Sequence, residues 1–433
     1  MPATSPPVTS SLSSQIPLLA APGALERDLA RFQAFRRPTA VLPGTPSTVA
    51  SRGAVPAYAN EFWTSRQRAG NSLHEISYRA CFKPEVPGFF LDRLSRPGDI
   101  VYDPFMGRGT TLIEAALRGR VPAGCDINPL GAVLVGPRLH PPTFEEVRAR
   151  LERIPMEWDG ELRDDLLAFY HSDTLREILA LRHYLLGRQR RGTLDAVDQW
   201  IRMVAVNRLT GHSPGFFSVY TLPPNQAVSV RSQERINKLR GQTPPYREIR
   251  PRILRKTRAL LRDLDAPTRA TLEKMSGGAR LWTQDAAHTP EIPSSSVSLV
   301  VTSPPFLDVV NYAQDNWLRL WFCGIDPASI PLTMTPDLDS WMQKMTDTFS
   351  ELRRVLRPGG HIAFEVGEIR GGALPLEEAV VASAERASLR PRLVMINRQQ
   401  FTKTAQVWGV DNGRKGTNTN RIVVIRKDTG ERP

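Results

Sequence analysis

Apolar and polar positions divide the chain into stretches of two kinds. Short apolar runs of strand length occur at residues 99–105, 121–129, 280–286 and 296–306. A stretch with apolar residues at three- and four-residue spacing, typical of a helix, separates the first two runs at 110–120. A strand, a Gly-rich turn, a helix and a second strand predict a pair of parallel strands.

The last third of the chain continues this pattern. It contains an amphipathic helix stopped by Pro-Gly-Gly and then four strand-like runs, at 341–360, 361–367, 392–401, 405–410 and 421–427. Because strands alternate with helices on both sides of the middle of the chain, we predict one α/β domain with a doubly wound sheet.

The middle of the chain has a different character. Residues 144–154, 164–187 and 194–209 show helical spacing, and a segment rich in Pro and Gly at 212–229 interrupts them. We predict a largely helical insertion over 143–275, which divides the catalytic α/β domain into 51–142 and 276–433. Residues 1–50, rich in Ser, Pro, Ala and Thr, are predicted to be a disordered tail.

Charge adds a candidate partner to this picture. The 433 residues carry a formal net charge of +13. Residues 231–262 hold eleven Lys or Arg against two Glu. Such a segment favours contact with nucleic-acid phosphates, although a solvated basic helix is the simpler alternative. The candidate DNA-binding residues are Arg231, Arg235, Lys238, Arg240, Arg250, Arg252, Arg255 and Lys256.

Cysteine and histidine positions exclude several classes of site. Cys81, Cys125 and Cys323 lie far apart, and neither a CxxC pair nor a Cys/His cluster exists, so we expect neither a disulfide framework nor a metal site. The N-terminal residues lack the basic region of a signal peptide, and no apolar stretch is long enough to span a membrane. We therefore expect a cytoplasmic protein with no membrane partner.

The first motif with chemical content is DPFMGRGTT, residues 103–111. Gly107 and Gly109 allow positive φ and close approach of the backbone to a ligand, and Thr110 or Thr111 is predicted to cap the helix that follows. Asp126 ends the next strand 17 residues after Gly109, where an acid accepts hydrogen bonds from ribose hydroxyls. The turn, the helix, the next strand and the acid together favour nucleoside binding over a tight turn that binds nothing. The loop lacks the Lys and Ser/Thr of a P-loop and the third Gly of the dinucleotide fingerprint, which favours an adenosyl ligand without phosphates over a phosphate-bearing cofactor.

The second motif is TSPPF, residues 302–306, directly after an apolar strand. Two prolines make the turn rigid and expose neighbouring carbonyls as acceptors, and Ser303 adds a hydroxyl. Phe306 offers a flat face. This arrangement suits an amino group on an aromatic base, which needs acceptors for its hydrogens and a ring to stack on. A proline turn packed against a core aromatic explains the same residues equally well.

Together the two motifs resemble the cofactor and catalytic loops of the DNA amino methyltransferases, enzymes that modify adenine N6 or cytosine N4. The Ser form of the catalytic loop is typical of the N4-cytosine enzymes. The resemblance implies the Rossmann-like sheet of the class I adenosylmethionine-dependent methyltransferases, S-adenosyl-L-methionine as cofactor, double-stranded DNA as substrate, and a cognate restriction endonuclease as a candidate partner. It also places target recognition in the helical insertion, between the two loops.

The resemblance further implies a role for each matching residue. The methionine part and sulfonium would contact the loop of Asp103, Pro104, Phe105, Gly107, Gly109, Thr110 and Thr111, while Asp126 would hold the ribose and Asp285 the adenine amino group. Ser303 and the Pro304 carbonyl would accept from the target amine, with Pro305 completing the turn and Phe306 stacked on the base. Phe82 and Pro84 lie in a segment similar to the one that closes over the methionine end, and residues 401–409 offer a second wall for the base.

Three alternatives stay open. The first keeps the enzyme class but changes the target to adenine N6. The second replaces DNA by RNA, because a basic surface and an amine-binding loop do not encode the sugar. The third is an inactive DNA-binding homologue that retains the fold.

Overall fold

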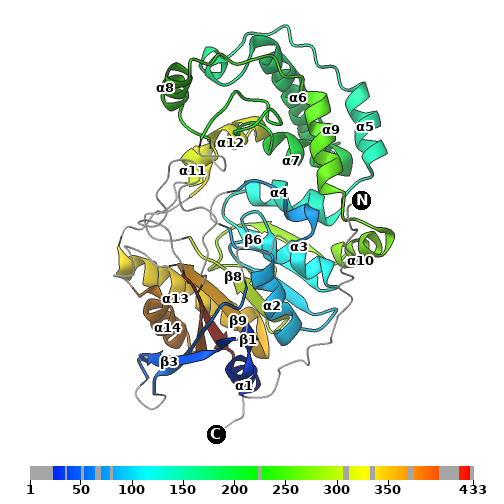
Figure 1. Ribbon diagram of the computed structural model, residues 1–433. Coiled ribbons are helices and arrows are strands. Elements are labelled where there is room, and N and C mark those ends of the chain that lie inside the picture. Colours follow the sequence, from blue (N-terminus) through cyan, green and yellow to red (C-terminus); the bar gives the residue numbers. More distant parts are fainter. Residues whose placement is uncertain are drawn as a thin grey trace, which may run out of the picture.

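A nine-stranded sheet forms the centre of the protein. The computed structural model describes residues 23–34, 37–49, 53–63, 70–78, 81–222, 227–305, 312–331, 337–367, 375–398 and 419–429. The sheet has the order β3-β4-β10-β11-β9-β8-β5-β6-β7 (Figure 1). The strands are β3 (Ala40–Thr45), β4 (Val55–Asn60), β5 (Ile100–Asp103), β6 (Val121–Asp126), β7 (Arg280–Thr283), β8 (Val297–Thr302), β9 (Leu356–Gly367), β10 (Arg390–Arg398) and β11 (Thr419–Arg426).

Most neighbouring strands of this sheet are parallel. Strands β9, β8, β5, β6 and β7 run in one direction, and β4 pairs in parallel with β10. Strand β11 is antiparallel to both of its neighbours, and β3 is antiparallel to β4. All six residues of β8 are buried, which explains its largely apolar sequence. The predicted α/β fold with a mostly parallel sheet is therefore confirmed.

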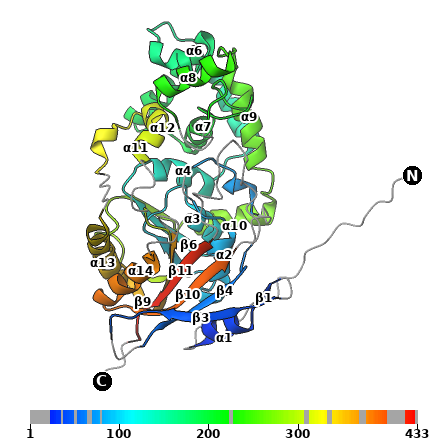
Figure 2. The same ribbon diagram turned by 60° about the vertical axis from the view of Figure 1, so that its left-hand side comes forward.

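Helices cover both faces of the sheet (Figures 1 and 2). One face packs against α1 (Ala24–Arg31), α2 (Glu85–Leu94), α3 (Thr110–Leu117), α4 (Leu130–Leu139) and α10 (Ala266–Ser276). The other packs against α13 (Leu338–Val355) and α14 (Leu376–Arg386). The alternation within the strands produces this division: Val301 belongs to the core on the α2 side and Val300 to the core on the α13 side.

The structure corrects the predicted tail in its second half. Residues 24–31 form α1, whose Leu25 and Leu29 are buried against the sheet, and β3 pairs with β4. A two-stranded ribbon, β1 (Gln33–Ala34) and β2 (Arg37–Pro38), connects them. Composition alone did not predict these elements, because a short amphipathic helix needs only a few apolar residues when these pack against a sheet. Residues 1–22 lie outside the described part of the chain.

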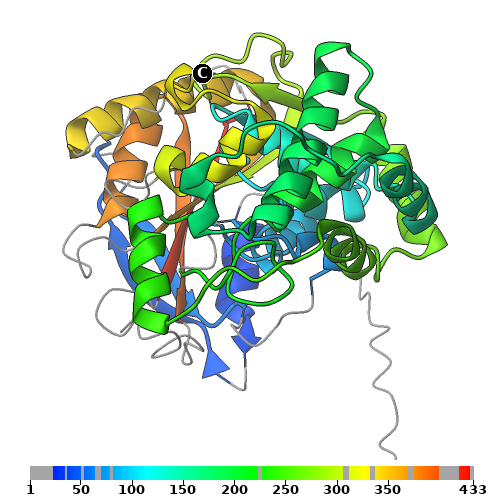
Figure 3. The same cartoon turned by 90° about the horizontal axis from the view of Figure 1, so that it is seen from above.

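A second layer of helices lies beyond the carboxyl ends of the parallel strands (Figure 1). We call it the helical region; it comprises α5 (Phe144–Arg153), η3 (Asp164–Ala168), α6 (Ser172–Arg190), α7 (Ala196–Val206), α8 (Val230–Arg240), α9 (Ile249–Leu260), α11 (Tyr312–Asp315) and α12 (Trp317–Cys323). Seen from above, α13 and α14 lie beside this region (Figure 3). A short helix, η2 (Ser72–His74), lies between α3 and α9, and η4 (Pro327–Ser329) follows α12.

The helical region and the predicted insertion do not coincide. Helix α10 falls within the predicted insertion but packs on α3 and β6, whereas α12 comes after the TSPPF motif and packs on α6 and α7. A boundary drawn from helical spacing cannot detect this exchange, because both helices have the same local pattern whichever layer receives them.

Candidate active site

A cavity of about 270 Å³ lies where β5, β6, β7 and β8 end. The carboxyl ends of parallel strands in such a sheet are where ligands bind. Of the predicted residues it is lined by Pro104, Phe105, Gly107, Asp126, Asp285, Ser303 and Pro305. Four loops separated by up to about two hundred residues of sequence therefore meet at one site.

Asp126 is oriented by the Gly-rich loop. One carboxylate oxygen accepts from the N–H of Gly107 at 2.8 Å, and the other accepts from the N–H of Asn128 at 2.9 Å. Burial raises the pKa of Asp126, while these two hydrogen bonds oppose the shift. The carboxylate is thus fixed at the cavity, with acceptor capacity left for a pair of hydroxyl groups.

Backbone conformation explains both glycines of this loop. Gly107 has φ 47° and Gly109 φ 75°, in the left-handed region. A side chain at Gly109 would also overlap Val135 of α4. The predicted threonine cap is wrong, because Gly109 itself is the N-cap residue of α3. The hydroxyl of Thr111 instead donates to the carbonyl of Val301 at 2.9 Å.

Asp103 does not line the cavity, and the cofactor contact that the resemblance implies for it stays a prediction. Its side chain is 2% exposed, and one oxygen accepts from the Thr302 hydroxyl at 2.6 Å and from the N–H of Phe105 at 3.1 Å. Burial raises the pKa of Asp103 to about 7. Because Thr302 directly precedes Ser303, this carboxyl group joins the DPFMGRGTT loop to the TSPPF loop.

The catalytic loop presents Ser303 and Pro305 to the cavity. Pro304 is buried and is not one of the lining residues of the cavity. The Pro305 carbonyl accepts from the indole N–H of Trp341 at 3.1 Å, which anchors the turn to helix α13. Phe306 and residues 401–409 lie outside the described residues.

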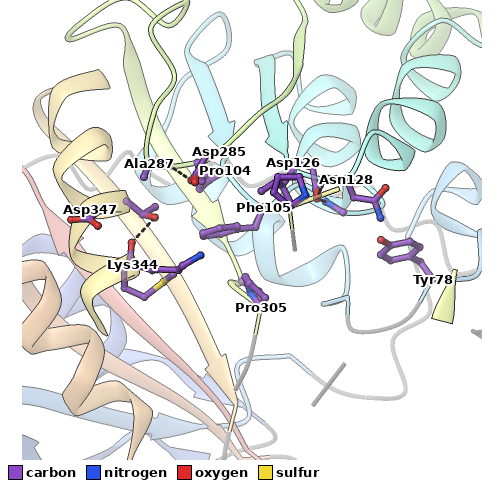
Figure 4. A pocket seen from close by; sticks show the side chains of 17 residues that line it. Tyr78, Pro104, Phe105, Asp126, Asn128, Asp285, Ala287, Pro305, Lys344 and Asp347 are labelled. Atoms are coloured by element: carbon purple, nitrogen blue, oxygen red, sulfur yellow. Dashed lines mark hydrogen bonds between the residues drawn. The ribbon is translucent and has the colours of Figure 1, made fainter. Parts of the chain in front are cut away.

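Sequence reasoning missed the residues that α13 contributes. Lys344, Met345, Asp347 and Thr348 line the cavity. Lys344 extends toward Phe105, at the end of the cavity where Asp285 lies, whereas Asp126 and Tyr78 lie toward the other end (Figure 4). Asn128 and Ile127 also line the site. Only Asn128 carried a signal, because it follows Asp126 at the end of a strand.

Tyr78 reaches the cavity on a segment held by three arginines. Their guanidinium groups donate to successive carbonyl oxygens: Arg138 to Leu73 at 3.0 Å, Arg108 to His74 and Ile76 at 3.2 and 2.9 Å, and Arg319 to Ser77 at 3.2 Å. Arg138 is completely buried, and burial lowers its pKa to about 9. Phe82 and Pro84, predicted nearby, do not line the cavity.

Comparison with known proteins bears on this site. Residues 50–130, which include the cofactor loop and Asp126, match a protein family described as DNA methylase. Over these residues the chain is similar to a DNA methylase domain. The resemblance stated from the DPFMGRGTT motif is confirmed over these residues.

Two curated proteins are similar to parts of this chain. Type II methyltransferase M.MjaII of Methanocaldococcus jannaschii is 28% identical over 139 residues, which cover 31% of this chain and 26% of that protein. Type II methyltransferase M.BsoBI of Geobacillus stearothermophilus is 20% identical over 317 residues, 65% of this chain and 60% of that protein. The chain thus matches less than two thirds of the length of each.

Among solved structures, TrmN from Thermus thermophilus is similar with a TM-score of 0.30 and 13% identity. The match covers 82% of this chain and 51% of that one.

The basic residues predicted to bind DNA fall into two environments. On α8, Arg231, Arg235, Lys238 and Arg240 are all exposed. Of the four candidates on α9, Arg255 alone is exposed.

The other three candidates on α9 are partly buried and have contacts within the protein. Arg250 donates to the carbonyls of Leu151 and Ile154, Arg252 donates to that of Pro214, and Lys256 lies 3.8 Å from Glu75. Burial lowers the pKa of Lys256 to about 8. Amphipathic spacing put apolar residues on one face of α9 but could not show which cations the neighbouring helices enclose.

Metal-ligating side chains do not cluster in the described part of the chain. Within the described ranges, no group of three or more His, Cys, Asp or Glu side chains has the geometry of a metal site. No helix among those residues combines the length and apolarity required to cross a lipid bilayer.

Proposed function

We propose that this chain is an S-adenosyl-L-methionine-dependent DNA methyltransferase that modifies an exocyclic amino group, with cytosine N4 as the target. One observation carries the proposal: Asp126, Asp285 and Ser303 line a single cavity at the carboxyl ends of parallel strands. The match of residues 50–130 to the DNA methylase family and the type II methyltransferase relatives support it.

The residues present fit an adenosyl ligand. The amide nitrogen of Asn128 is buried and has no partner among the described residues, so the cavity wall offers a donor to a ligand acceptor. Asp126 is held in place to accept from two ribose hydroxyls. Asp285 is exposed at the end of the cavity that Phe105 and Lys344 also line, which suits an adenine amino group. When bound, the cofactor would supply the electrophilic methyl group.

Ser303 and the Pro304 carbonyl of the same turn would prepare the nucleophile. An exocyclic amine is a poor nucleophile because its lone pair is delocalised into the ring. Acceptors fixed at the cavity favour a pyramidal nitrogen and stabilise the positive charge that develops on it. The hydrogen bonds of Thr302 and Trp341 hold these acceptors, so little reorganisation is needed during transfer.

The experiment that tests the proposal is methyl transfer from tritiated S-adenosyl-L-methionine to mixed-sequence duplex DNA, with nucleoside digestion and mass spectrometry. N4-methyldeoxycytidine is the expected product. N6-methyldeoxyadenosine would keep the reaction and correct the base. Cofactor binding without either product would overturn DNA as the substrate.

A first prediction concerns Ser303. The variant Ser303→Ala should lower turnover by about two orders of magnitude, because it removes one acceptor for the developing charge, and should leave affinity for S-adenosylhomocysteine nearly intact. Ser296→Ala is a matched control, because Ser296 directly precedes β8, at the end of the strand away from the cavity, and its hydroxyl donates to the carbonyl of Pro293. Equal loss of turnover and cofactor affinity would contradict the role of Ser303.

The type II relatives also support a restriction–modification context, in which methylation protects DNA from a partner endonuclease. We expect DNA treated with the active protein to resist cleavage by an endonuclease of the same target sequence. Complete cleavage of fully methylated DNA would exclude this context.

A further inference from the structure

Arg208 carries a positive charge that no carboxylate among the described residues pairs with. It follows α7 directly, and its guanidinium carbon lies 4.0 Å from the centroid of the Phe216 ring. Its Nε donates to the carbonyl of Asn207 at 2.8 Å. No hydrogen bond or ion pair within the described part of the chain uses its two Nη atoms. The half-buried guanidinium group is thus held by stacking on the Phe216 ring and by the hydrogen bond of its Nε. Its Nη edge is left for a ligand.

The surrounding loop, residues 207–222, fixes this side chain in place. Arg247 donates to the carbonyls of Ser213, Phe216 and Ser218, at 3.4 and 3.1 Å for the first two. A Cβ atom at Gly211 would overlap the Phe216 ring, so this position requires glycine. A guanidinium group fixed before binding loses little side-chain entropy when it meets an anion.

The loop is joined to the candidate active site through the segment that carries Tyr78. Asn207 accepts from the N–H of Ser77 at 2.8 Å, and Tyr78 lines the cavity. Arg319, whose guanidinium carbon lies 5.8 Å from the centroid of the Tyr78 ring, donates to the Ser77 carbonyl. Arg208 therefore lies on the helical region beside the cavity wall.

Electrostatics at this position favour an anion. Burial lowers the pKa of Arg208 to about 10, and the charge of Arg319 contributes, so Arg208 remains protonated at neutral pH. Lys256 adds a third positive charge nearby. Glu75 offsets Lys256 and Asp315 offsets Arg319, which leaves Arg208 as the cation that a bound anion would neutralise.

We propose that Arg208 binds a phosphodiester group of the DNA strand that delivers the target base to the cavity. The planar Nη edge matches two phosphate oxygens, which an ammonium group cannot do. The inference rests on the proposed function and adds a contact between the helical region and the substrate strand.

Methylation kinetics on unmethylated genomic DNA test the proposal. Arg208→Gln should raise the KM for DNA about tenfold or more, and lower the slope of log KM against log salt concentration by about one. The dissociation constant for S-adenosylhomocysteine should not change. Arg148→Gln is the matched control, and its KM and salt slope should equal those of the wild type. Arg148 is an exposed residue of α5 whose charge is balanced by Glu145 and Glu152.

The outcomes separate this inference from the proposed function. Methyl transfer by the wild type together with an unchanged KM and salt slope in Arg208→Gln would overturn the phosphate contact alone. Absence of methyl transfer by the wild type would overturn both. If Arg208→Gln unfolds, Arg208→Lys keeps the charge but lacks the planar edge. An elevated KM in a stable Lys variant supports the contact, and a wild-type KM overturns it.

Discussion

Gly109 shows how one backbone conformation controls the candidate cofactor site. Gly109 has φ 75°, and a Cβ atom at this position would overlap the side chain of Val135. A larger residue would therefore require a shift of the loop. We predict that Gly109→Ala weakens binding of S-adenosylhomocysteine and destabilises the fold by about 2 kcal/mol or more, measured by calorimetric titration and urea unfolding.

Gly192→Ala is the control for this prediction. Gly192 has φ 66° with open space around it, so only the conformational cost of about 1 kcal/mol applies and ligand affinity should be unchanged. Equal effects of the two variants would show that the contact with Val135 is unimportant.

Thr302 is the residue through which the buried Asp103 carboxyl group acts on the catalytic loop. Thr302→Val removes one of the two hydrogen bonds that this buried Asp103 oxygen accepts, at a cost of about 1–3 kcal/mol in unfolding free energy. We expect turnover to fall more than cofactor affinity, and Thr302→Ser to restore both. A Ser variant as impaired as the Val variant would point to packing rather than to the hydrogen bond.

At the scale of elements, α13 is tied to the loop that carries Asp285. Glu351 of α13 accepts from the N–H and hydroxyl of Thr289, at 2.9 and 2.6 Å, and pairs with Arg354 at 2.6 Å. The hydrogen bond from Arg354 is the main cause that lowers the pKa of Glu351, to about 2. This contact explains how a helix on one face of the sheet keeps Lys344 and Asp347 opposite Asp285.

The lowered pKa gives a pH-dependent prediction. A carboxylate with a depressed folded-state pKa stabilises the fold above its unfolded value, near 4.3, and this stabilisation is lost as pH falls toward 2. Glu351→Gln should therefore lower the unfolding free energy at pH 7 by about 1 kcal/mol, since solvent screens part of the pair. The difference from the wild type should shrink below pH 4. A difference independent of pH would contradict this origin.

At the scale of the whole molecule, the basic residues of α8 and α9 lie in different environments, although the sequence presents them as one basic segment. The four basic residues of α8 are exposed, whereas Arg250 and Arg252 of α9 hold neighbouring carbonyl groups. Replacing Arg231, Arg235, Lys238 and Arg240 by Gln should weaken DNA binding and lower the salt slope by about 0.9 for each phosphate that the variant no longer neutralises.

The paired variant Arg250→Gln with Arg252→Gln should mainly lower the melting temperature and leave the salt slope unchanged. An unchanged salt slope in the α8 variant would show that α8 is a solvated basic helix that makes no phosphate contacts.

The sequence alone determined the elements of the sheet core and the two loops at its carboxyl edge. Those features depend on local periodicity and on glycine and proline conformations, which each segment carries by itself. Tertiary structure alone decided that Tyr78, Lys344 and Asp347 share the cavity and that Asp103 is buried outside its lining. It also decided that α1 packs on the sheet and that β3 forms its edge strand. These outcomes depend on which distant surfaces bury one another, and the same local pattern permits several such arrangements.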